Sequence, residues 1–419
     1  MREITVRKGT IITNKTKMPR VLYIVYWGAL EQLGQSLVVP AVKKLAKMGV
    51  ELTLVTFEKP EDLMRTVELN RVQKMFSEDN IEWIPLKYHK DPKIPATAFD
   101  IIQGIALGLR KRLGKRFDII HARCYIGGLM GLFLSPLMRA KFVYHNEGFY
   151  PDEQVDGGIW GKNSRTHIIA KRLENLMYAR ANGIIALSHR AKAIIEKLPE
   201  VARKKTPVTF VPSCVDLETF HLPEKRPDFS ADEIKLVYIG SVGGRYILDK
   251  IGAFVAAARK INPNVTLQIY SKADINLITE MLDAGGLERE AWKSEAVPYN
   301  EMPSLLAMYQ AGLFFLTQGI SEHGCSPTKI GEYWAVGLPV ITSPNVSDTD
   351  DIINRDKVGV TIKEHSEADY LRAFEELCEI LKSKKLATRC RKSAEDHYAL
   401  TPACERQFAL YQQLVKIKY

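Results

Sequence analysis

Short runs of apolar, often β-branched residues alternate with longer segments of helical periodicity along the first half of the chain. Such runs, which predict strands, occur at 20–27, 50–58, 117–122, 140–145, 182–188 and 207–212. Between the first two runs, residues 36–49 carry apolar side chains at helical spacing and end at a glycine. This alternation predicts a doubly wound parallel sheet.

A second alternating series follows a break at residues 212–233, which are rich in proline and charge and which we interpret as a linker. Its apolar runs predict a second parallel sheet and lie at 234–240, 265–271, 311–317 and 338–343. We therefore expect an α/β protein of two Rossmann-like, doubly wound domains that face each other across a cleft. Ligands of such folds bind at the carboxyl ends of the strands.

The composition narrows the class of protein. With 419 residues, 46% hydrophobic and 26% charged, the chain is long enough for two or three globular domains. The apolar stretch at 125–138 is too short to span a bilayer, no signal peptide is visible, and the six cysteines lack metal-ligand spacing. We expect a cytoplasmic protein without a metal site. Ser-His-Asp order and HExxH and Walker A motifs are absent, so hydrolase, zinc-protease and NTPase activities lack support.

The net charge of +10 is unevenly distributed. Residues 1–213 hold 35 Lys and Arg against 20 Asp and Glu, whereas residues 214–419 hold 24 against 29. A helix predicted at 100–118 carries an apolar stripe of Ile101, Ile105, Leu109 and Leu113, and ends in the cations Arg110, Lys111, Arg112, Lys115 and Arg116. If the stripe packs on the sheet, these cations only complement the helix dipole. Five cations in seven residues exceed that need and predict attachment to an anionic membrane.

A short helix is predicted at residues 326–337, directly after a polar loop. Ser326 is a candidate N-cap, Pro327 suits the first helical position, and Gly337 suits the left-handed position that follows a helix. The free backbone N–H groups at such a helix start form an anion site.

Two charged residues share one face of this predicted helix. Lys329 adds a positive charge beside the anion site, and Glu332 lies three residues further on. A carboxylate there is able to accept two hydrogen bonds from the vicinal hydroxyls of a ribose, so the pair indicates a nucleotide site. The alternative is an intrahelical ion pair between Lys329 and Glu332.

Other candidates follow predicted strands. Glycines and cations after the strand at 234–240 offer a phosphate close backbone approach and charge: Gly240, Gly243, Arg245 and Lys250. The long loop at 28–36 places Gly34, Gln35 and Ser36 nearest the cleft. Two further strands end at His121 and Arg123 and at His145 and Glu147. Histidines at strand ends serve catalysis in some proteins and are hydrogen-bonded structural residues in others, and both interpretations stay open.

Together these segments resemble glycosyltransferase family four, the group 1 retaining enzymes of the GT-B fold. The donor-site pattern of that family is similar to "SPTKIGEYWAVGLPVI". Further matches, in the family's order, are "GALEQLGQSLVVPAVKKLAKMGVELTLVTFEK", "FDIIHARCY", "RLENLMYARANGIIALS" and "VPSCVDLETF". The segments "LGQS…VTFEK" and "EGFYPDEQVDGGIW" resemble a bacterial subgroup that serves envelope polysaccharide synthesis.

The resemblance implies a role for each candidate residue. Glu332 would hold the ribose and Lys329 the diphosphate; the other implied donor-binding residues are Ser326, Thr328, Gly240, Ser241, Gly243, Lys250, Val297 and Pro298. Catalytic groups would be Lys329, Arg245, His121, Arg123 and His145, and the facing loop would contribute Gly34, Gln35, Ser36 and Glu147. We expect an acceptor-side domain at 1–213, a donor domain at 214–395, and a C-terminal helix, 396–419, that crosses back to the N-terminal domain.

Three positions depart from the family pattern. The family's first glutamate, eight residues before the ribose-binding one, is replaced by Gly324, with Glu322 nearby but out of register. Ser241 stands where many members have an arginine, and Arg245, five residues before Lys250, is the candidate replacement. Arg123 stands in place of the second histidine of a His-x-His pattern.

The expected activity is transfer of a sugar, with retention, from a nucleoside-diphosphate sugar to an acceptor hydroxyl, without a cofactor or metal. Expected partners are the donor, a glycan or lipid-linked acceptor and an anionic membrane surface at the inner face of the cell membrane, and no nucleic acid. Two alternatives stay open: a GT-B sugar-nucleotide epimerase, and a non-catalytic nucleotide-sugar-binding partner of another transferase.

Overall fold

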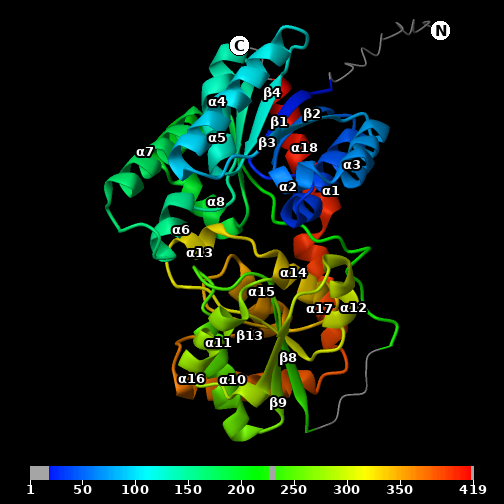
Figure 1. The fold of residues 1–419 in the computed structure, drawn as a ribbon, viewed down its shortest axis with the longest axis vertical. Coiled ribbons are helices and arrows are strands. Elements are labelled where there is room, and N and C mark those ends of the chain that lie inside the picture. The colour runs from blue at the N-terminus through cyan, green and yellow to red at the C-terminus, as the bar shows by residue number, and fades with distance from the viewer. Residues whose placement is uncertain (1–17, 226–231, 417–419) are drawn as a thin grey trace, which may run out of the picture.

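The computed structural model describes residues 18–225 and 232–416, which form two α/β domains, one above the other in Figure 1. Each domain is built on one parallel sheet, and separate hydrophobic clusters cover the two faces of each sheet. This architecture confirms the predicted fold class of two Rossmann-like, doubly wound domains.

The N-terminal sheet has seven parallel strands in the order β3-β2-β1-β4-β5-β6-β7. These are β1 (Arg20–Val25), β2 (Glu51–Glu58), β3 (Glu82–Lys87), β4 (Ile119–Arg123), β5 (Lys141–His145), β6 (Gly183–Ala186) and β7 (Val208–Phe210). The strand order reverses beside β1, so the ends of β1 and β4 open a crevice toward the second domain. Val25 and Arg123, the last residues of these two strands, are register partners.

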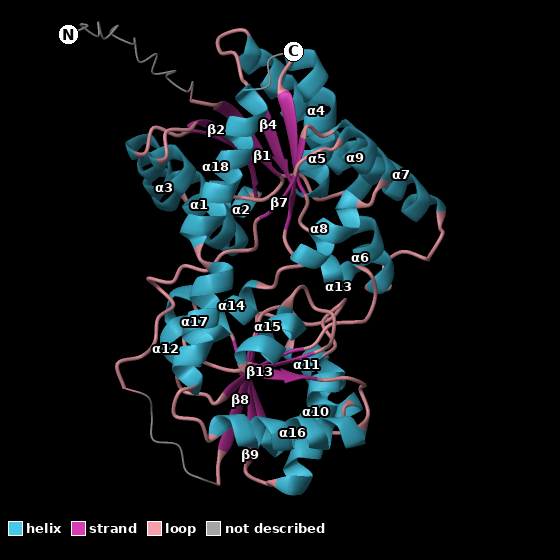
Figure 2. Cartoon of the chain, turned by 180° about the vertical axis from the view of Figure 1, so that it is seen from behind, coloured by secondary structure: helices cyan, strands magenta, loops and turns pink. Residues whose placement is uncertain are grey.

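Helices flank this sheet on both faces (Figure 2). They are α1 (Val39–Lys47), α2 (Pro60–Leu63), α3 (Thr66–Glu78), α4 (Lys93–Arg112), α5 (Cys124–Met138), α6 (Tyr150–Asp156), α7 (Arg165–Arg180), α8 (His189–Glu196) and α9 (Pro199–Lys204), with a π-helical turn η1 (Gly34–Val38) before α1. The helix expected at 100–118 is α4. Of the predicted apolar stripe, Ile101, Ile105 and Leu109 pack, partly buried, against the hydrophobic cluster on the sheet, whereas Leu113 is exposed. The fully buried residues of α4 are Ala96, Asp100, Gly104 and Gly108.

The C-terminal sheet has six parallel strands in the order β10-β9-β8-β11-β12-β13. These are β8 (Ile234–Ile239), β9 (Val265–Tyr270), β10 (Trp292–Glu295), β11 (Ala311–Phe314), β12 (Val340–Thr342) and β13 (Gly359–Thr361). The helical elements are α10 (Leu248–Ile261), α11 (Ile275–Ala284), α12 (Met302–Leu306), α13 (Ser321–Gly324), α14 (Thr328–Ala335), α15 (Thr349–Asp356), α16 (Glu367–Leu381) and α17 (Leu386–Tyr398), with short turns η2 (Arg289–Ala291) and η3 (Tyr299–Glu301).

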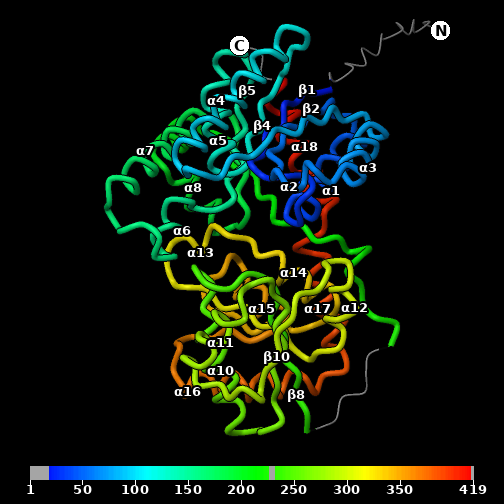
Figure 3. Tube along the Cα trace, viewed as in Figure 1, coloured from blue at the N-terminus to red at the C-terminus, as the bar shows by residue number. Residues whose placement is uncertain are grey.

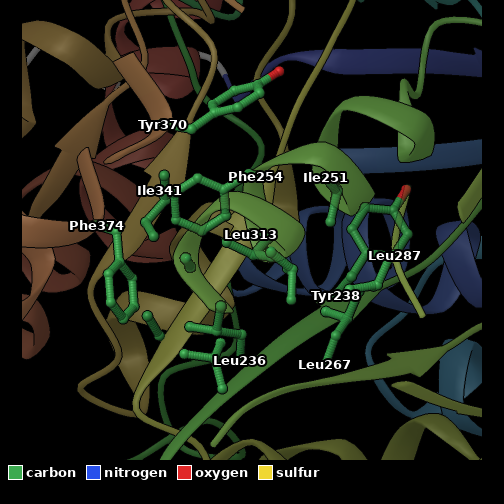
Figure 4. Packing of buried hydrophobic residues seen from close by; sticks show 14 of the residues in the cluster. Leu236, Tyr238, Ile251, Phe254, Leu267, Leu287, Leu313, Ile341, Tyr370 and Phe374 are labelled. Atoms are coloured by element: carbon green, nitrogen blue, oxygen red, sulfur yellow. The ribbon is translucent and has the colours of Figure 1, made fainter. Parts of the chain in front are cut away.

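The apolar strand runs of this domain point into two cores, because a sheet covered on both faces buries every residue of its central strands. One core packs α10 and α16 against the sheet (Figure 4). Its labelled members include Leu236, Tyr238, Phe254, Leu313, Ile341 and Phe374. The other core lies under α14 and α17. Helix α14 is therefore held rigidly between the sheet and α17, which fixes the side chains at its start.

The last helix, α18 (Leu400–Lys416), leaves the C-terminal domain and packs on the N-terminal one. In Figure 3 the red end of the chain runs from the lower domain into the upper one. Its Leu410, Tyr411 and Leu414 belong to the same buried cluster as β1 and α1. The two domains are thus tied by two chain crossings, at residues near 213 and near 399.

A second contact between the domains lies on the other side of the cleft. Ser321 of α13 donates its hydroxyl to Asp156 of α6 at 2.5 Å. Asp348, from the C-terminal domain, accepts the backbone N–H groups of His189 and Arg190 at 2.7 and 3.1 Å. It thereby satisfies N–H groups at the start of α8, as an N-cap residue would. These contacts hold the domains in a closed arrangement.

Candidate functional site

A cavity of about 550 Å³ lies between the domains, at the carboxyl ends of the C-terminal strands. The C-terminal domain supplies most of its wall: Ile239, Gly240, Ser241, Val242, Tyr246, Tyr270, Ser271, Lys272, Ala273, Ala296, Val297, Tyr299, Met302, Thr328, Lys329 and Glu332. The N-terminal domain closes it with Gln32, Leu33 and Ser36. A cavity of this size accommodates a ligand as large as a nucleotide sugar.

Helix α14 begins at this cavity, but its start differs from the prediction. The helix runs from Thr328 to Ala335, Pro327 is its N-cap, and no side chain caps it. The predicted capping role of Ser326 is wrong, because its Oγ instead accepts the backbone N–H of Ser213 at 3.0 Å, across the domain crossing. Gly337 has the expected positive φ of 81° after the helix. The first N–H groups of α14 therefore remain available to a ligand.

Lys329 places an amine in the cavity wall without a hydrogen-bond partner among the described residues. Its Nζ lies 4.0, 5.0 and 5.1 Å from the ring centres of Tyr246, Tyr238 and Phe314. Burial lowers the pKa of the amine to about 7. Gly240 makes room for it, since a Cβ at that position would lie 2.5 Å from Lys329 Cε and φ there is 110°. The amine is thus held ready for an anion that the protein itself does not supply.

Glu332 lies on the same wall, one helical turn further along. Its side chain is buried, with 4% exposure, and Oε1 accepts the hydroxyl of Tyr299 at 2.6 Å. Burial raises the pKa of this carboxyl to about 7. Among the described residues the Lys329 amine has no hydrogen-bond partner, Glu332 included, so the intrahelical pair considered as an alternative is not formed. Both groups are instead directed to the cavity.

Arg245 lies beside the cavity and bridges two acidic side chains. Its guanidinium is 3.0 Å from Glu153 of the N-terminal domain and 3.6 Å from the buried Glu322. The nearby Gly324 has no room for the family's first glutamate, because a Cβ there would lie 2.9 Å from Phe149. Glu322 therefore supplies the carboxylate of this region from a position two residues earlier.

The N-terminal loop at 28–36 contributes to the cavity less than expected. Gly34 packs against the backbone of Gly28, and Gln35 donates its amide to the carbonyl of Ala29, so both are used within the loop. Of the three predicted residues only Ser36 lines the cavity, together with the unpredicted Gln32 and Leu33.

The two candidate histidines lie inside the N-terminal domain and not on the cavity wall. The Tyr411 hydroxyl accepts from Gln407 and is hydrogen-bonded to His121 Nδ1, both at 2.7 Å. His121 Nε2 and His145 Nδ1 share a hydrogen bond at 3.1 Å, and His145 Nε2 lies 3.5 Å from Glu147. Burial lowers the pKa of both histidines well below the usual value, so both are neutral. This arrangement favours the structural interpretation.

Glu147 and Arg123 end this buried chain with an ion pair. The guanidinium of Arg123 also donates to the carbonyl of Leu37 in η1 at 3.0 Å. The histidine chain therefore stabilises the turn that carries Ser36 to the cavity.

The remaining candidates divide by position. Gly240, Ser241, Val297 and Thr328 line the cavity with Lys329 and Glu332. Gly243, Lys250, Pro298 and Ser326 do not line it, and Lys250 lies 3.5 Å from its neighbour Asp249 on α10. Sequence reasoning missed the aromatic residues Tyr246, Tyr270 and Tyr299. These tyrosines lie after a strand, at the end of a strand or at the start of a turn. Many other residues occupy such positions, so the sequence alone does not mark these three as cavity residues.

Two facing Rossmann-like domains with a nucleotide-sized cavity between them define the GT-B class of protein. Sucrose-phosphate synthase from Thermosynechococcus elongatus has this fold, with a TM-score of 0.68 and 13% identity over 95% of this chain and 99% of its own. A glycosyltransferase from Rickettsia africae aligns with a TM-score of 0.68 and 12% identity over 96% and 100% of the two chains. HepE from Anabaena, solved with UDP and glucose, aligns with a TM-score of 0.64 and 13% identity over 95% and 100%. At such identities these similarities establish the fold.

The sequence itself identifies the enzyme class. Residues 36–219 match the model of Glycosyltransferase Family 4. A comparison with curated protein sequences found no match. Residues 36–219 are thus similar to Glycosyltransferase Family 4, and this match together with the GT-B fold supports a glycosyltransferase.

Proposed function

We propose that the protein transfers a sugar, with retention, from a nucleoside-diphosphate sugar to an acceptor hydroxyl. The observation that carries the proposal is the presence of Lys329 and Glu332 on one cavity wall. A diphosphate would provide the negative charge that the unpartnered amine lacks. A ribose would provide hydroxyl donors to the carboxylate. The fold is that of HepE, which was solved with UDP and glucose.

Stabilisation of the leaving diphosphate follows from the start of α14. The backbone N–H groups of Thr328 and Lys329 have no intrahelical partners there, and the helix dipole adds partial positive charge. A bound diphosphate would raise the pKa of the Lys329 amine again, so the amine would act as a cation beside the departing oxygen. Charge held in place before the reaction stabilises the transition state without reorganisation.

The donor set of the cavity favours metal-free chemistry. Glu332 is the one carboxylate on the cavity wall, and the proposal assigns it to the ribose. Among residues 18–225 and 232–416, no group of three or more His, Cys, Asp or Glu is arranged to hold a metal ion. We therefore assign charge neutralisation to Lys329 and α14, and no cofactor to the reaction.

Retention is proposed to occur by front-face attack. The acceptor oxygen bonds to the anomeric carbon while the bond from that carbon to the phosphate oxygen breaks. The leaving phosphate takes the proton of the acceptor hydroxyl, so no protein nucleophile is needed. Arg245, held between Glu153 and Glu322, lies beside the cavity at the domain interface and would steady the closed form during this step.

The acceptor is proposed to be a glycan or a lipid-linked saccharide of cell-surface polysaccharide or glycolipid synthesis. The surplus of cations in residues 1–213 supports work at an anionic membrane surface, on the cytoplasmic side. None of the described helices is long and apolar enough to cross a membrane. We propose that the attachment is peripheral.

A thermal-shift screen of UDP-, GDP-, ADP- and dTDP-sugars tests the donor assignment. A donor at one hundred times its dissociation constant should stabilise the protein by about 2.7 kcal/mol. The selected donor is then incubated with and without candidate acceptors. Transfer or slow hydrolysis supports the proposal, whereas an isomeric nucleotide sugar would indicate an epimerase, and binding without turnover a non-catalytic partner.

A further inference from the structure

Helix α4 buries its small residues fully and leaves some of its large apolar ones exposed. The fully buried positions are Ala96, Asp100, Gly104 and Gly108, spaced four residues apart along one face. An amphipathic helix on a soluble protein normally keeps its large apolar side chains inside, so the exposed ones of α4 need an explanation.

Close packing against α5 explains which face is inside. A Cβ on Gly104 would lie 2.6 Å from Met130 Sδ, and one on Gly108 would lie 2.9 Å from Leu134 Cδ1. Any larger residue at these positions would push the helices apart. The buried Asp100 accepts hydrogen bonds from the Tyr26 hydroxyl at 2.7 Å and the His89 backbone at 3.0 Å. The orientation of α4 is therefore fixed by its glycines and by this carboxylate.

The outward face of α4 carries no charge over about four turns. Phe99 is 53% exposed and Ile102 is 65% exposed, and Leu113, just after the helix, is 90% exposed. Between Lys93 and Arg110 the only charged residue is the buried Asp100. Large apolar side chains on a charge-free surface normally mark an interaction site.

The neighbouring helix α5 extends this surface. It contains no charged residue, and its Phe133 and Leu137 are 51% and 49% exposed. Figure 1 shows α4 and α5 side by side on the outer side of the N-terminal domain, and the packing of Gly104 and Gly108 on α5 agrees. We call this surface the α4–α5 face and define it by Phe99, Ile102, Leu113, Phe133 and Leu137.

Cations border one end of the α4–α5 face. Arg110, Arg112, Arg116 and Arg139 are exposed there, whereas Lys111 pairs with Glu82 and Lys115 lies 5.8 Å from the Phe117 ring centre. Arg112 donates to the carbonyl of Leu137, which brings a cation to the apolar surface. The pattern is an apolar strip with a basic margin.

We propose that the α4–α5 face docks on an anionic lipid bilayer. The apolar side chains enter the boundary between headgroups and acyl chains, and the arginines meet lipid phosphates. A second copy of the chain fits less well, because its own α4–α5 face carries the same basic margin and offers these cations no anionic partner. The inference rests on the proposed function in one respect: a lipid-linked acceptor gives the docking its use.

Vesicle co-sedimentation of the full-length protein tests the proposal. Phosphatidylcholine vesicles with and without phosphatidylglycerol are used at low and high salt. Wild type should bind the anionic vesicles, and part of the binding should persist at high salt. Replacing the apolar side chains (F99Q with I102Q) should weaken partitioning at least about ten-fold. The matched control, M308Q with I261Q, alters exposed apolar residues of the C-terminal domain and should bind as wild type does.

Other outcomes would overturn the inference. These are no binding by wild type, binding abolished by salt and unchanged in F99Q/I102Q, or a wild-type dimer in sedimentation velocity that the double variant dissociates. The emission of an environment-sensitive fluorophore attached at I102C should shift to shorter wavelength on vesicles, whereas the emission of one attached at M308C should not. Each of these proteins keeps the other apolar residues of the α4–α5 face. Donor turnover in free solution is measured in parallel. Docking on vesicles without donor turnover would refute only the proposed function. Donor turnover without docking would refute only the membrane inference.

Discussion

Replacing Lys329 by methionine is expected to stabilise the empty protein while it impairs catalysis. The Lys329 amine has no hydrogen-bond partner among the described residues, and burial lowers its pKa from 10.5 to about 7. One pKa unit corresponds to about 1.4 kcal/mol, so the buried charge costs at most roughly 4 to 5 kcal/mol of folding free energy at pH values below 7. Methionine keeps the length and the apolar stem and removes that cost.

The pH dependence of this effect has a definite sign. Between about pH 7 and 10.5 the unfolded chain keeps the proton on Lys329 and the folded chain does not, so stability rises with pH over this window. Glu332 has the opposite dependence: its pKa is raised from 4.5 to about 7, so its contribution to stability falls as the pH rises from 4.5 to 7. The two residues together make the empty site least stable near pH 7.

Urea unfolding between pH 5 and 10 measures this effect, and donor turnover measures the cost to catalysis. Lys329→Met should have a higher free energy of unfolding than wild type at pH 6, and the difference should shrink toward pH 10. Turnover should fall roughly 100- to 1,000-fold, because a cation at the leaving group is lost. Lys260→Met, on the exposed side of α10, is the matched control and should change neither quantity. A Lys329→Met protein that is less stable than wild type at pH 6, or fully active, would refute the reasoning.

Three further predictions follow from the site and its support. Glu332→Gln should raise the dissociation constant of the nucleotide roughly ten- to one-hundred-fold by calorimetry, and unchanged affinity would remove the ribose assignment. Activity should survive a chelator; loss on chelation that Mg²⁺ or Mn²⁺ restores would contradict metal-free stabilisation of the leaving group. Tyr411→Phe removes the hydroxyl that is hydrogen-bonded to the buried His121 and should lower the free energy of unfolding by about 1 to 3 kcal/mol in urea. An equally stable variant would show that the buried chain does not stabilise the fold.

The central strands of both sheets were predictable from sequence, whereas three edge strands were not. The strands β3, β10 and β13 each lie at a sheet edge. Edge strands bury one side less completely and therefore carry polar residues or proline. Strand β10 reads Trp-Lys-Ser-Glu, β3 contains Pro85, and β13 has only three residues. None of the three gives the continuous apolar run that marks a buried strand.

Local signals predicted the position of α14 and of its two charged residues better than they predicted the surroundings of each residue. Lys329 and Glu332 were identified because three-residue spacing places both on one helical face. The capping role of Ser326 was predicted wrongly. Its side chain accepts the N–H of Ser213, which is 113 residues away in sequence, and local spacing does not reveal such a partner. The orientation of α4 depends on whether glycines or larger residues meet α5, which helical periodicity alone does not decide.

The most direct test of the central claim is the release of nucleoside diphosphate by wild type and by Lys329→Met. Each is incubated with the donor selected by thermal shift and with an acceptor, and the nucleotide and the anomeric configuration of the product are determined by NMR. The account predicts that wild type releases nucleoside diphosphate and forms a product with the donor's anomeric configuration, and that Lys329→Met loses this activity almost completely. Release at the wild-type rate by Lys329→Met, or an inverted product, would contradict it.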